Sequence, residues 1–179
     1  MSKKRKPGST WAFKMMSLIH DNPFRQKFAN PWKTLEAAGL KSGQRVLEVG
    51  CGPGFFTIPA AQIVSDTGII LALDIHPLAV KRVEEKIKKE GISNVKTILA
   101  DAADSGISDQ SIDLAFLFGL PRLLRDVDLF SEILEEMYRV LRSGGIISIK
   151  SSNKKLIETV ESKKFSFLAH KNGILLFTK

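Results

Sequence analysis

Three glycines at alternate positions, Gly50, Gly52 and Gly54, are the first feature of the sequence that could support chemistry. They follow a short apolar run at residues 45–49 and precede a helical pattern. Glycine adopts φ angles that side chains disfavour, and its missing Cβ lets a ligand lie against bare backbone. A loop of this kind, after the first strand of an open α/β sheet, is where ligands bind in such folds. The alternative is a tight strand-to-helix connection without a ligand.

The spacing of these glycines excludes two phosphate-binding motifs. The dinucleotide fingerprint G-x-G-x-x-G would require glycine at position 55, where the chain has Phe55. The phosphate loop G-x-x-x-x-G-K-[ST] has no match in the sequence. Since neither motif accounts for the loop, its ligand has to be inferred from other residues.

Two acids, Asp74 and Asp101, follow the next two apolar runs along the chain. Because the ends of adjacent parallel strands converge on one edge of a sheet, we expect both carboxylates to line the same pocket as the glycine loop. A carboxylate there can accept two ribose hydroxyl hydrogens or one exocyclic amine, which suits a nucleoside ligand. Two alternatives stay open: Asp74 could cap the helix that starts at Pro77, and Asp104 could take the role of Asp101.

The elements that position these residues are predicted from the alternation of short apolar runs with longer helical patterns, which is typical of a mostly parallel sheet covered by helices. The runs are nearly all apolar, as in strands buried on both faces. They cover residues 45–49, 69–73, 95–100, 112–118 and 146–149. Helices are predicted at 55–64, at 78–90 between Pro77 and Gly91, and at 127–141, where Gly144-Gly145 ends the pattern.

An Asn-Gly pair near the end of the sequence, Asn172-Gly173, predicts a tight hairpin turn. The strands it joins are expected at 165–169 and 174–178. The sheet should therefore end in two antiparallel strands, whereas a plain dinucleotide-binding fold would continue with parallel crossovers.

With its glycine loop and companion acids, the chain resembles class I S-adenosylmethionine-dependent methyltransferases of the small-molecule, quinone-biosynthesis-like group (methyltransferase type 11). The resemblance covers about residues 31–179. It implies a Rossmann-like, doubly wound α/β fold with a seven-stranded, mostly parallel sheet in the order 3-2-1-4-5-7-6, strand 7 being antiparallel. It also implies S-adenosyl-L-methionine as cofactor, S-adenosyl-L-homocysteine as product and methyl transfer by in-line displacement.

The resemblance assigns the methionine portion of the cofactor to the glycine loop. Glu48 and the backbone of Gly50, Cys51, Gly52 and Gly54 would hold it. We interpret Cys51 as a small buried side chain beside the cofactor and not as a nucleophile.

The nucleoside portion is assigned, by the same resemblance, to the ends of the later strands. Asp74 would take the ribose hydroxyls, with Ile75 beside the adenine. Asp101 and Ala102 would meet the adenine edge, and Phe118-Gly119 would close the pocket after the fourth strand.

The sequence lacks the motifs of several other methyltransferase classes, and this limits the reactions that it can be expected to catalyse. The Asn/Asp-Pro-Pro-Tyr/Phe motif of adenine and cytosine amino-methyltransferases is replaced by Phe-Gly-Leu-Pro-Arg at 118–122. Carbon-5 pyrimidine methylation needs a cysteine nucleophile away from the cofactor loop, and arsenite methylation needs several cysteines, whereas Cys51 is the single cysteine. A catechol-type metal site would need acids where the chain has Gly119 and residues 150–153, so no catalytic metal is predicted. None of the three histidines has a spacing that identifies a general base, and catalytic residues are left unassigned.

The formal net charge of +8 lies at the two ends of the chain. Residues 1–14 carry 5 basic and no acidic side chains, and residues 151–179 carry 6 basic and 2 acidic ones. Residues 15–150 are nearly neutral, with 16 basic and 17 acidic side chains. A nucleic-acid surface would be expected to spread its cations through the folded middle, so the charge alone gives weak support for RNA. A solvated basic tail is the simpler interpretation.

We divide the chain into a basic tail and lid segment at residues 1–30 and a cofactor-binding domain at 31–179. Aromatic and basic side chains interleave in the first segment. They favour a lid over cofactor and substrate, ahead of a membrane-facing or lipid-binding surface and of RNA contacts. The segment lacks the Phe/Tyr-Asp signature of quinone-type enzymes, so the acceptor is predicted only as a small molecule. Arg122 and Arg125 could attract an anionic acceptor, or could be plain surface residues.

The sequence thus predicts a transferase with a small-molecule methyl acceptor. An RNA methyltransferase that uses the basic ends and a non-catalytic cofactor-binding subunit are the alternatives. No run approaches the roughly 18 apolar residues of a membrane helix, and the first residues lack the apolar segment of a secretory signal, so a cytoplasmic location is expected.

Overall fold

The sheet at the centre of the fold has the predicted strand order. The computed structural model describes residues 5, 7–20, 30–118, 126–151, 153 and 155–179. Its seven strands follow the order β3-β2-β1-β4-β5-β7-β6. The parallel part consists of β1 (Arg45–Val49), β2 (Ile69–Asp74), β3 (Val95–Leu99), β4 (Ile112–Leu117) and β5 (Leu141–Lys150). β7 (Ile174–Thr178) is antiparallel to its two neighbours, β5 and β6 (Ser166–Lys171).

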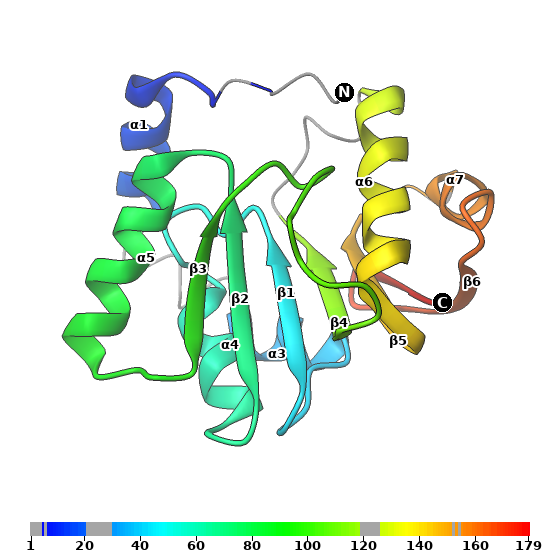
Figure 1. Cartoon of the computed structure of the whole chain (residues 1–179), viewed down its shortest axis with the longest axis horizontal. Helices are drawn as coiled ribbons and strands as arrows, with labels where there is room; N and C mark the ends of the chain where they lie inside the picture. The colour runs from blue at the N-terminus through cyan, green and yellow to red at the C-terminus, as the bar shows by residue number, and fades with distance from the viewer. Residues whose placement is uncertain (1–4, 6, 21–29, 119–125, 152, 154) are drawn as a thin grey trace.

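Helices cover both faces of this sheet, which makes it doubly wound (Figure 1). On one face lie α3 (Pro31–Ala37), α4 (Thr57–Val64) and α5 (Pro77–Glu90), which share an apolar cluster with the sheet. On the other face lie α6 (Val127–Val140) and α7 (Leu156–Glu161). A further helix, α1 (Thr10–His20), lies beside α5. No helix among the described residues is long and apolar enough to cross a bilayer.

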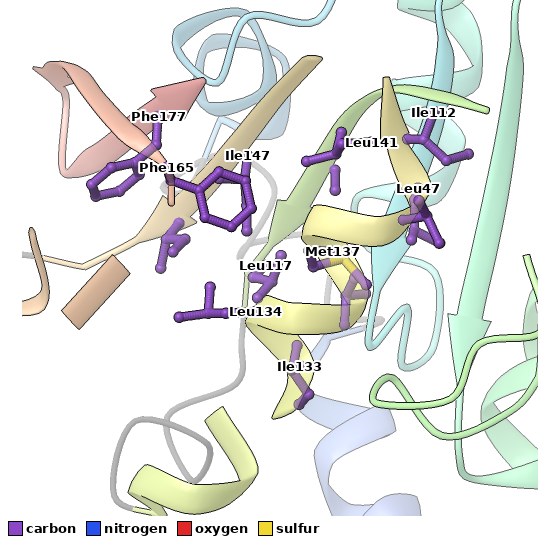
Figure 2. Packing of buried hydrophobic residues seen from close by; sticks show 14 of the residues in the cluster. Leu47, Ile112, Leu117, Ile133, Leu134, Met137, Leu141, Ile147, Phe165 and Phe177 are labelled. Atoms are coloured by element: carbon purple, nitrogen blue, oxygen red, sulfur yellow. The ribbon is translucent and has the colours of Figure 1, made fainter. Parts of the chain in front are cut away.

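The apolar stripe of α6 supplies much of the core on its side of the sheet. Figure 2 shows Ile133, Leu134 and Met137 of α6 packed toward Leu117 and Ile147 of the strands. Leu134 and Met137 are fully buried, as their helical spacing predicted. Each such side chain contributes about 1.5–3 kcal/mol through burial, so packing holds the helix on the sheet.

The start of α5 carries its own cap. Pro77 is its first residue, as predicted, and His76 is the N-cap, whose Nδ1 accepts a hydrogen bond from Leu78 N at 3.2 Å. Gly91, with φ +66°, ends the helix. Asp74 was the alternative cap in the sequence, and the structure gives that role to His76.

The Gly144-Gly145 pair does not end a helix, contrary to the sequence-based prediction. α6 stops at Val140, and β5 begins directly at Leu141, so both glycines lie inside the strand. The register between β4 and β5 shifts there, and a Cβ on Gly145 would lie 2.8 Å from the carbonyl oxygen of Arg142. The glycines are therefore needed for an irregularity in the strand.

The terminal hairpin is confirmed. Asn172 and Gly173 have φ angles of +50° and +75°, the positive values that a tight turn requires. The turn places β6 at the edge of the sheet, next to β7.

Candidate functional site

The glycine loop is fixed to the end of the neighbouring strand. The backbone N–H groups of Gly50 and Cys51 both donate to the carbonyl oxygen of Leu73 in β2, at 2.8 and 3.0 Å. Gly50, Gly52 and Gly54 have φ angles of +76°, +51° and +83°. A Cβ on Gly54 would also lie 3.2 Å from a methyl group of Val83 in α5. This conformation and this close packing require glycine.

Asp74 connects the loop to the start of α5. One of its carboxylate oxygens accepts a hydrogen bond from Gly52 N at 2.9 Å, and the other accepts one from His76 N at 2.8 Å. The carboxylate is half-buried at the end of β2. The structure therefore brings together the first two features that the sequence singled out.

Glu48 lies buried beneath the loop, with 2 % of its surface exposed. The hydroxyl of Thr57, in the first turn of α4, donates to its Oε2 at 2.6 Å. Burial raises the pKa of Glu48 to about 8, and the negative charge of Asp74 adds to this effect, while the Thr57 hydrogen bond opposes it. At neutral pH this carboxyl group mostly holds its proton in the absence of a cationic partner. Thr57 has no motif that would have identified it in the sequence.

Cys51 is buried, as predicted. Burial raises the pKa of its thiol, and the negative charge of Asp74 raises it further. Because the thiolate is the reactive form, a thiol in this environment is a poor nucleophile at neutral pH.

A backbone hydrogen bond holds the segment that contains Asp101 beside Asp74. Ala100 N donates to the carbonyl oxygen of Asp74 at 3.1 Å, which places the residues after β3 beside the end of β2. Asp101 accepts a hydrogen bond from Ala103 N at 3.0 Å and a double contact from the guanidinium of Arg5. Asp104 is exposed, so Asp101 is the better placed of the two acids.

The contact with Arg5 was not foreseen. The charge pattern predicts a solvated basic tail, which is wrong for Arg5, because its guanidinium pairs with Asp101 and with Glu132 of α6. The two residues of the first pair are 96 positions apart, and no local pattern indicates a contact over that distance.

Three further predicted residues, Ile75, Ala102 and Phe118, follow the ends of β2, β3 and β4. Ile75 and Ala102 are half-buried, and Ala102 packs against the core on the α6 side. Phe118 is buried and has its ring centroid 5.1 Å from that of Phe56, which precedes α4. Gly119, Arg122 and Arg125 are outside the described residues. Phe56 is thus an aromatic neighbour of the loop that the sequence analysis did not assign.

The N-terminal helix contacts this edge as well. The ring of Phe13 in α1 stacks on that of His76, with centroids 4.6 Å apart and an angle of 15° between the planes. Both residues are buried. Residues 21–29 of the predicted lid fall outside the described part of the chain.

A metal cluster is not found in the described part of the chain, where no group of three or more His, Cys, Asp or Glu side chains could hold an ion.

Comparisons with known proteins identify the family and the fold of the chain. A family model described as "Methyltransferase domain" matches residues 40–174. The "Ubiquinone/menaquinone biosynthesis C-methyltransferase UbiE" of Citrobacter koseri is 32 % identical over 143 residues, which are 78 % of this chain and 55 % of the relative. The UbiE protein of Klebsiella pneumoniae strain 342 is 31 % identical with the same coverage. The chain spans about half the length of the curated relatives it matches.

Solved structures share the fold. A SAM-dependent methyltransferase from Aquifex aeolicus superposes with a TM-score of 0.77 at 22 % identity, covering 96 % of this chain and 97 % of the other. A putative S-adenosyl-L-methionine-dependent methyltransferase from Methanococcus maripaludis gives 0.72 at 20 % identity, covering 100 % and 97 %. At these identities the likeness concerns architecture. The family match, which covers most of the chain, places the protein in the methyltransferase-domain family.

Proposed function

We propose that the chain binds S-adenosyl-L-methionine at the carboxyl edge of β1, β2 and β3 and transfers its methyl group to a small-molecule acceptor. The observation that carries this proposal is the Asp74 carboxylate, which is held by Gly52 N and His76 N beside the glycine loop. A carboxylate oriented in this way retains free lone pairs for a ribose diol. Membership of the methyltransferase-domain family supports the same ligand.

The glycine loop fits the methionine end of the cofactor. Side chains are absent at Gly50, Gly52 and Gly54, so a ligand can lie on the backbone there. Cys51 lies within the same loop, and Glu48 beneath it is buried with Thr57 as a hydrogen-bond donor. A cation close to this buried carboxyl group would favour its ionised form, and the α-ammonium of the methionine portion could supply that cation.

The ends of β2 and β3 fit the nucleoside. Asp74 would take the ribose hydroxyls, with Ile75 beside the adenine. Asp101 and Ala102 would take the adenine edge. The backbone bond from Ala100 to Asp74 supports this assignment, because it keeps the two strand ends together. Phe118, with Gly119 after it, would close the pocket after β4.

Methyl transfer needs positioning more than it needs proton transfer. When bound, the cofactor supplies an activated methyl group whose sulfur leaves as a neutral thioether. The contribution of the chain is to hold an acceptor about 3 Å from that carbon and in line with the departing sulfur. Phe56 and Phe118 form an apolar wall near the loop, with the Lys150 ammonium 5.7 Å from the Phe56 ring centroid. The relatives' names, which describe C-methylation in ubiquinone and menaquinone biosynthesis, support a small-molecule acceptor.

These assignments give the two segments of the chain different roles. Residues 31–179 would form the cofactor domain, and residues 1–30 would form the lid. A cytoplasmic location fits a small-molecule enzyme of this kind.

Turnover with a panel of acceptors tests the proposal. The chain would be incubated with S-adenosyl-L-methionine and phenols, quinols, carboxylates or structured RNA, and S-adenosyl-L-homocysteine would be measured by mass spectrometry. We expect formation with a small-molecule acceptor, and loss by about tenfold or more in Asp74→Ala. Asp66→Ala, at an exposed loop position before β2, is the matched control and should behave as wild type. Cofactor binding without product from any acceptor would contradict transferase activity and favour a binding subunit, and product from RNA alone would contradict the small-molecule acceptor.

A further inference from the structure

The guanidinium of Arg5 is bound to the carboxylate of Asp101, which the proposed site would use at the adenine end of the cofactor. Its Nη1 atom lies 2.9 Å from Oδ1 and 3.1 Å from Oδ2 of Asp101. Its Nη2 atom donates to the carboxylate of Glu132 in α6. The side chains of Arg5 and Asp101 are 27 % and 18 % exposed. A charge-assisted contact of this kind, partly shielded from solvent, is firmer than an exposed ion pair.

A second contact anchors the same segment. Phe13, eight positions after Arg5, stacks on His76 at the start of α5. Arg5 contacts the end of β3 and α6, and Phe13 contacts the cap of α5. Figure 1 shows α5 and α6 on opposite sides of the carboxyl ends of β1 and β2, with α1 next to the upper end of α5. Arg5 and residues 7–13, which we name the N-terminal strap, therefore lie across the edge where the proposed cofactor lies.

The contacts of Asp101 leave little capacity for a ligand. A carboxylate has about four lone-pair sites. Both oxygens face Arg5, and Oδ1 also accepts a hydrogen bond from Ala103 N at 3.0 Å. The guanidinium also neutralises the charge that would attract the exocyclic amine of adenine. Arg5 and adenine are therefore in competition for the same acceptor.

We propose that the N-terminal strap is an autoinhibitory latch, in which Arg5 holds Asp101 and has to release it before the nucleoside end of the cofactor binds. The inference rests on the proposed function. Glu132 acts as the second half of the latch, because it holds Arg5 beside Asp101 from α6 without belonging to the cofactor site. The latch makes access to the site depend on the ionic contacts of a segment outside the cofactor domain.

The size of the effect follows from the population of the latched state. The dissociation constant of a ligand increases in inverse proportion to the fraction of molecules that can bind it. Ion pairs of this exposure favour the paired state by modest amounts, so removing Arg5 should tighten cofactor binding by about three- to tenfold. Salt weakens a partly exposed ion pair, so wild-type binding should tighten as the ionic strength rises.

Calorimetric titration of the full chain with S-adenosyl-L-homocysteine tests the latch. The proteins would be wild type, Arg5→Ala, Glu132→Gln and the control Lys14→Ala, which removes a positive charge from the exposed face of α1. Arg5→Ala should bind about three- to tenfold more tightly, Glu132→Gln should shift in the same direction, and Lys14→Ala should match wild type. Raising NaCl from about 50 to about 500 mM should tighten wild type toward Arg5→Ala and leave that variant nearly unchanged.

The outcomes separate the latch from the proposed function. Equal or weaker binding in both Arg5→Ala and Glu132→Gln would overturn the latch, while wild-type binding that is lost in Asp74→Ala would leave the cofactor site intact. Absence of binding in wild type and in every latch variant would instead contradict the proposed function. Glu132→Gln keeps the test decisive if Arg5→Ala does not fold, because it leaves the sequence of the strap unchanged and weakens the latch from α6 alone.

Discussion

The hydroxyl of Thr57 donates a hydrogen bond of 2.6 Å to the buried carboxyl group of Glu48. This contact joins the last residues of β1 to the first turn of α4, on the two sides of the glycine loop. It also gives a buried acid a polar partner, which an apolar environment requires. The protonation of Glu48 is therefore coupled both to the stability of the fold and to the proposed ligand.

The stability of the protein should fall as the pH rises through neutrality. The pKa of Glu48 is about 8 in the folded protein and 4.5 at its ordinary value, so the folded state binds more protons between these limits. The free energy of unfolding contributed by Glu48 is then fully present below the lower value and is lost as the pH approaches the upper one. The slope should be roughly 1 kcal/mol per pH unit. Urea unfolding of wild type and Glu48→Gln at pH 5 to 8 measures it, and equal slopes in the two proteins would show that Glu48 ionises normally.

Cofactor binding should release about one proton at neutral pH. Glu48 is mostly protonated in the free protein, and pairing with the α-ammonium of the methionine portion would favour its ionised form. The apparent binding enthalpy of S-adenosyl-L-homocysteine should therefore vary with the ionisation enthalpy of the buffer. The variation should disappear in Glu48→Gln. An enthalpy independent of buffer in wild type would argue against this pairing.

Substitution of Gly54 should affect the site more than the same substitution at another left-handed glycine. Gly54→Ala combines a positive φ with a Cβ 3.2 Å from Val83, whereas Gly106, with φ +67°, has no atom within 4 Å of its Cβ position. Each substitution should cost about 1 kcal/mol of stability through the backbone. We expect Gly54→Ala to weaken binding of S-adenosyl-L-homocysteine by about tenfold and Gly106→Ala to leave it unchanged. Identical binding in both variants would mean that the loop does not contact the ligand.

Truncation of Phe13 should loosen the N-terminal helix. Phe13→Ala removes the stacking contact on His76 and a buried phenyl group that joins α1 to the apolar cluster shared with α5. Loss of a buried phenyl group costs about 3–5 kcal/mol in a core, and the cost should be lower here because the helix can detach locally. Hydrogen exchange should therefore speed up in residues 10–20 and stay unchanged in β1. Unchanged exchange in α1 would show that the stacking contact does not anchor it.

Much of the parallel sheet could be predicted, because β1, β2 and β4 are short apolar runs with clear boundaries, whereas β3 is only partly buried despite its prediction as a strand covered on both faces. β1 was placed at its observed limits, and the turn at Asn172 was set by local chemistry. The boundary between α6 and β5 at Leu141 could not be predicted, because an apolar residue fits the last turn of a helix as well as the first position of a strand. Pairing with Ile112 decides between them, and that pairing is a long-range contact.

The candidate site could also be predicted only in part from the sequence. The glycine loop and Asp74 were found because strand ends in a parallel sheet converge on one edge, and the structure joins them by a hydrogen bond. Thr57 could not be identified as the partner of Glu48, because a single polar residue near a helix start is compatible with several roles. The contact of Arg5 with Asp101 depends on how the chain folds back over the sheet, which no local pattern encodes.

The most direct test of the central claim is the affinity of the chain for S-adenosyl-L-homocysteine, measured by titration calorimetry in wild type, Asp74→Ala and the control Asp66→Ala. Loss of a doubly hydrogen-bonded carboxylate should cost more than about 1.4 kcal/mol. The account predicts micromolar binding in wild type and Asp66→Ala and a loss of at least about tenfold in Asp74→Ala. Binding that survives Asp74→Ala together with Gly52→Val would contradict it.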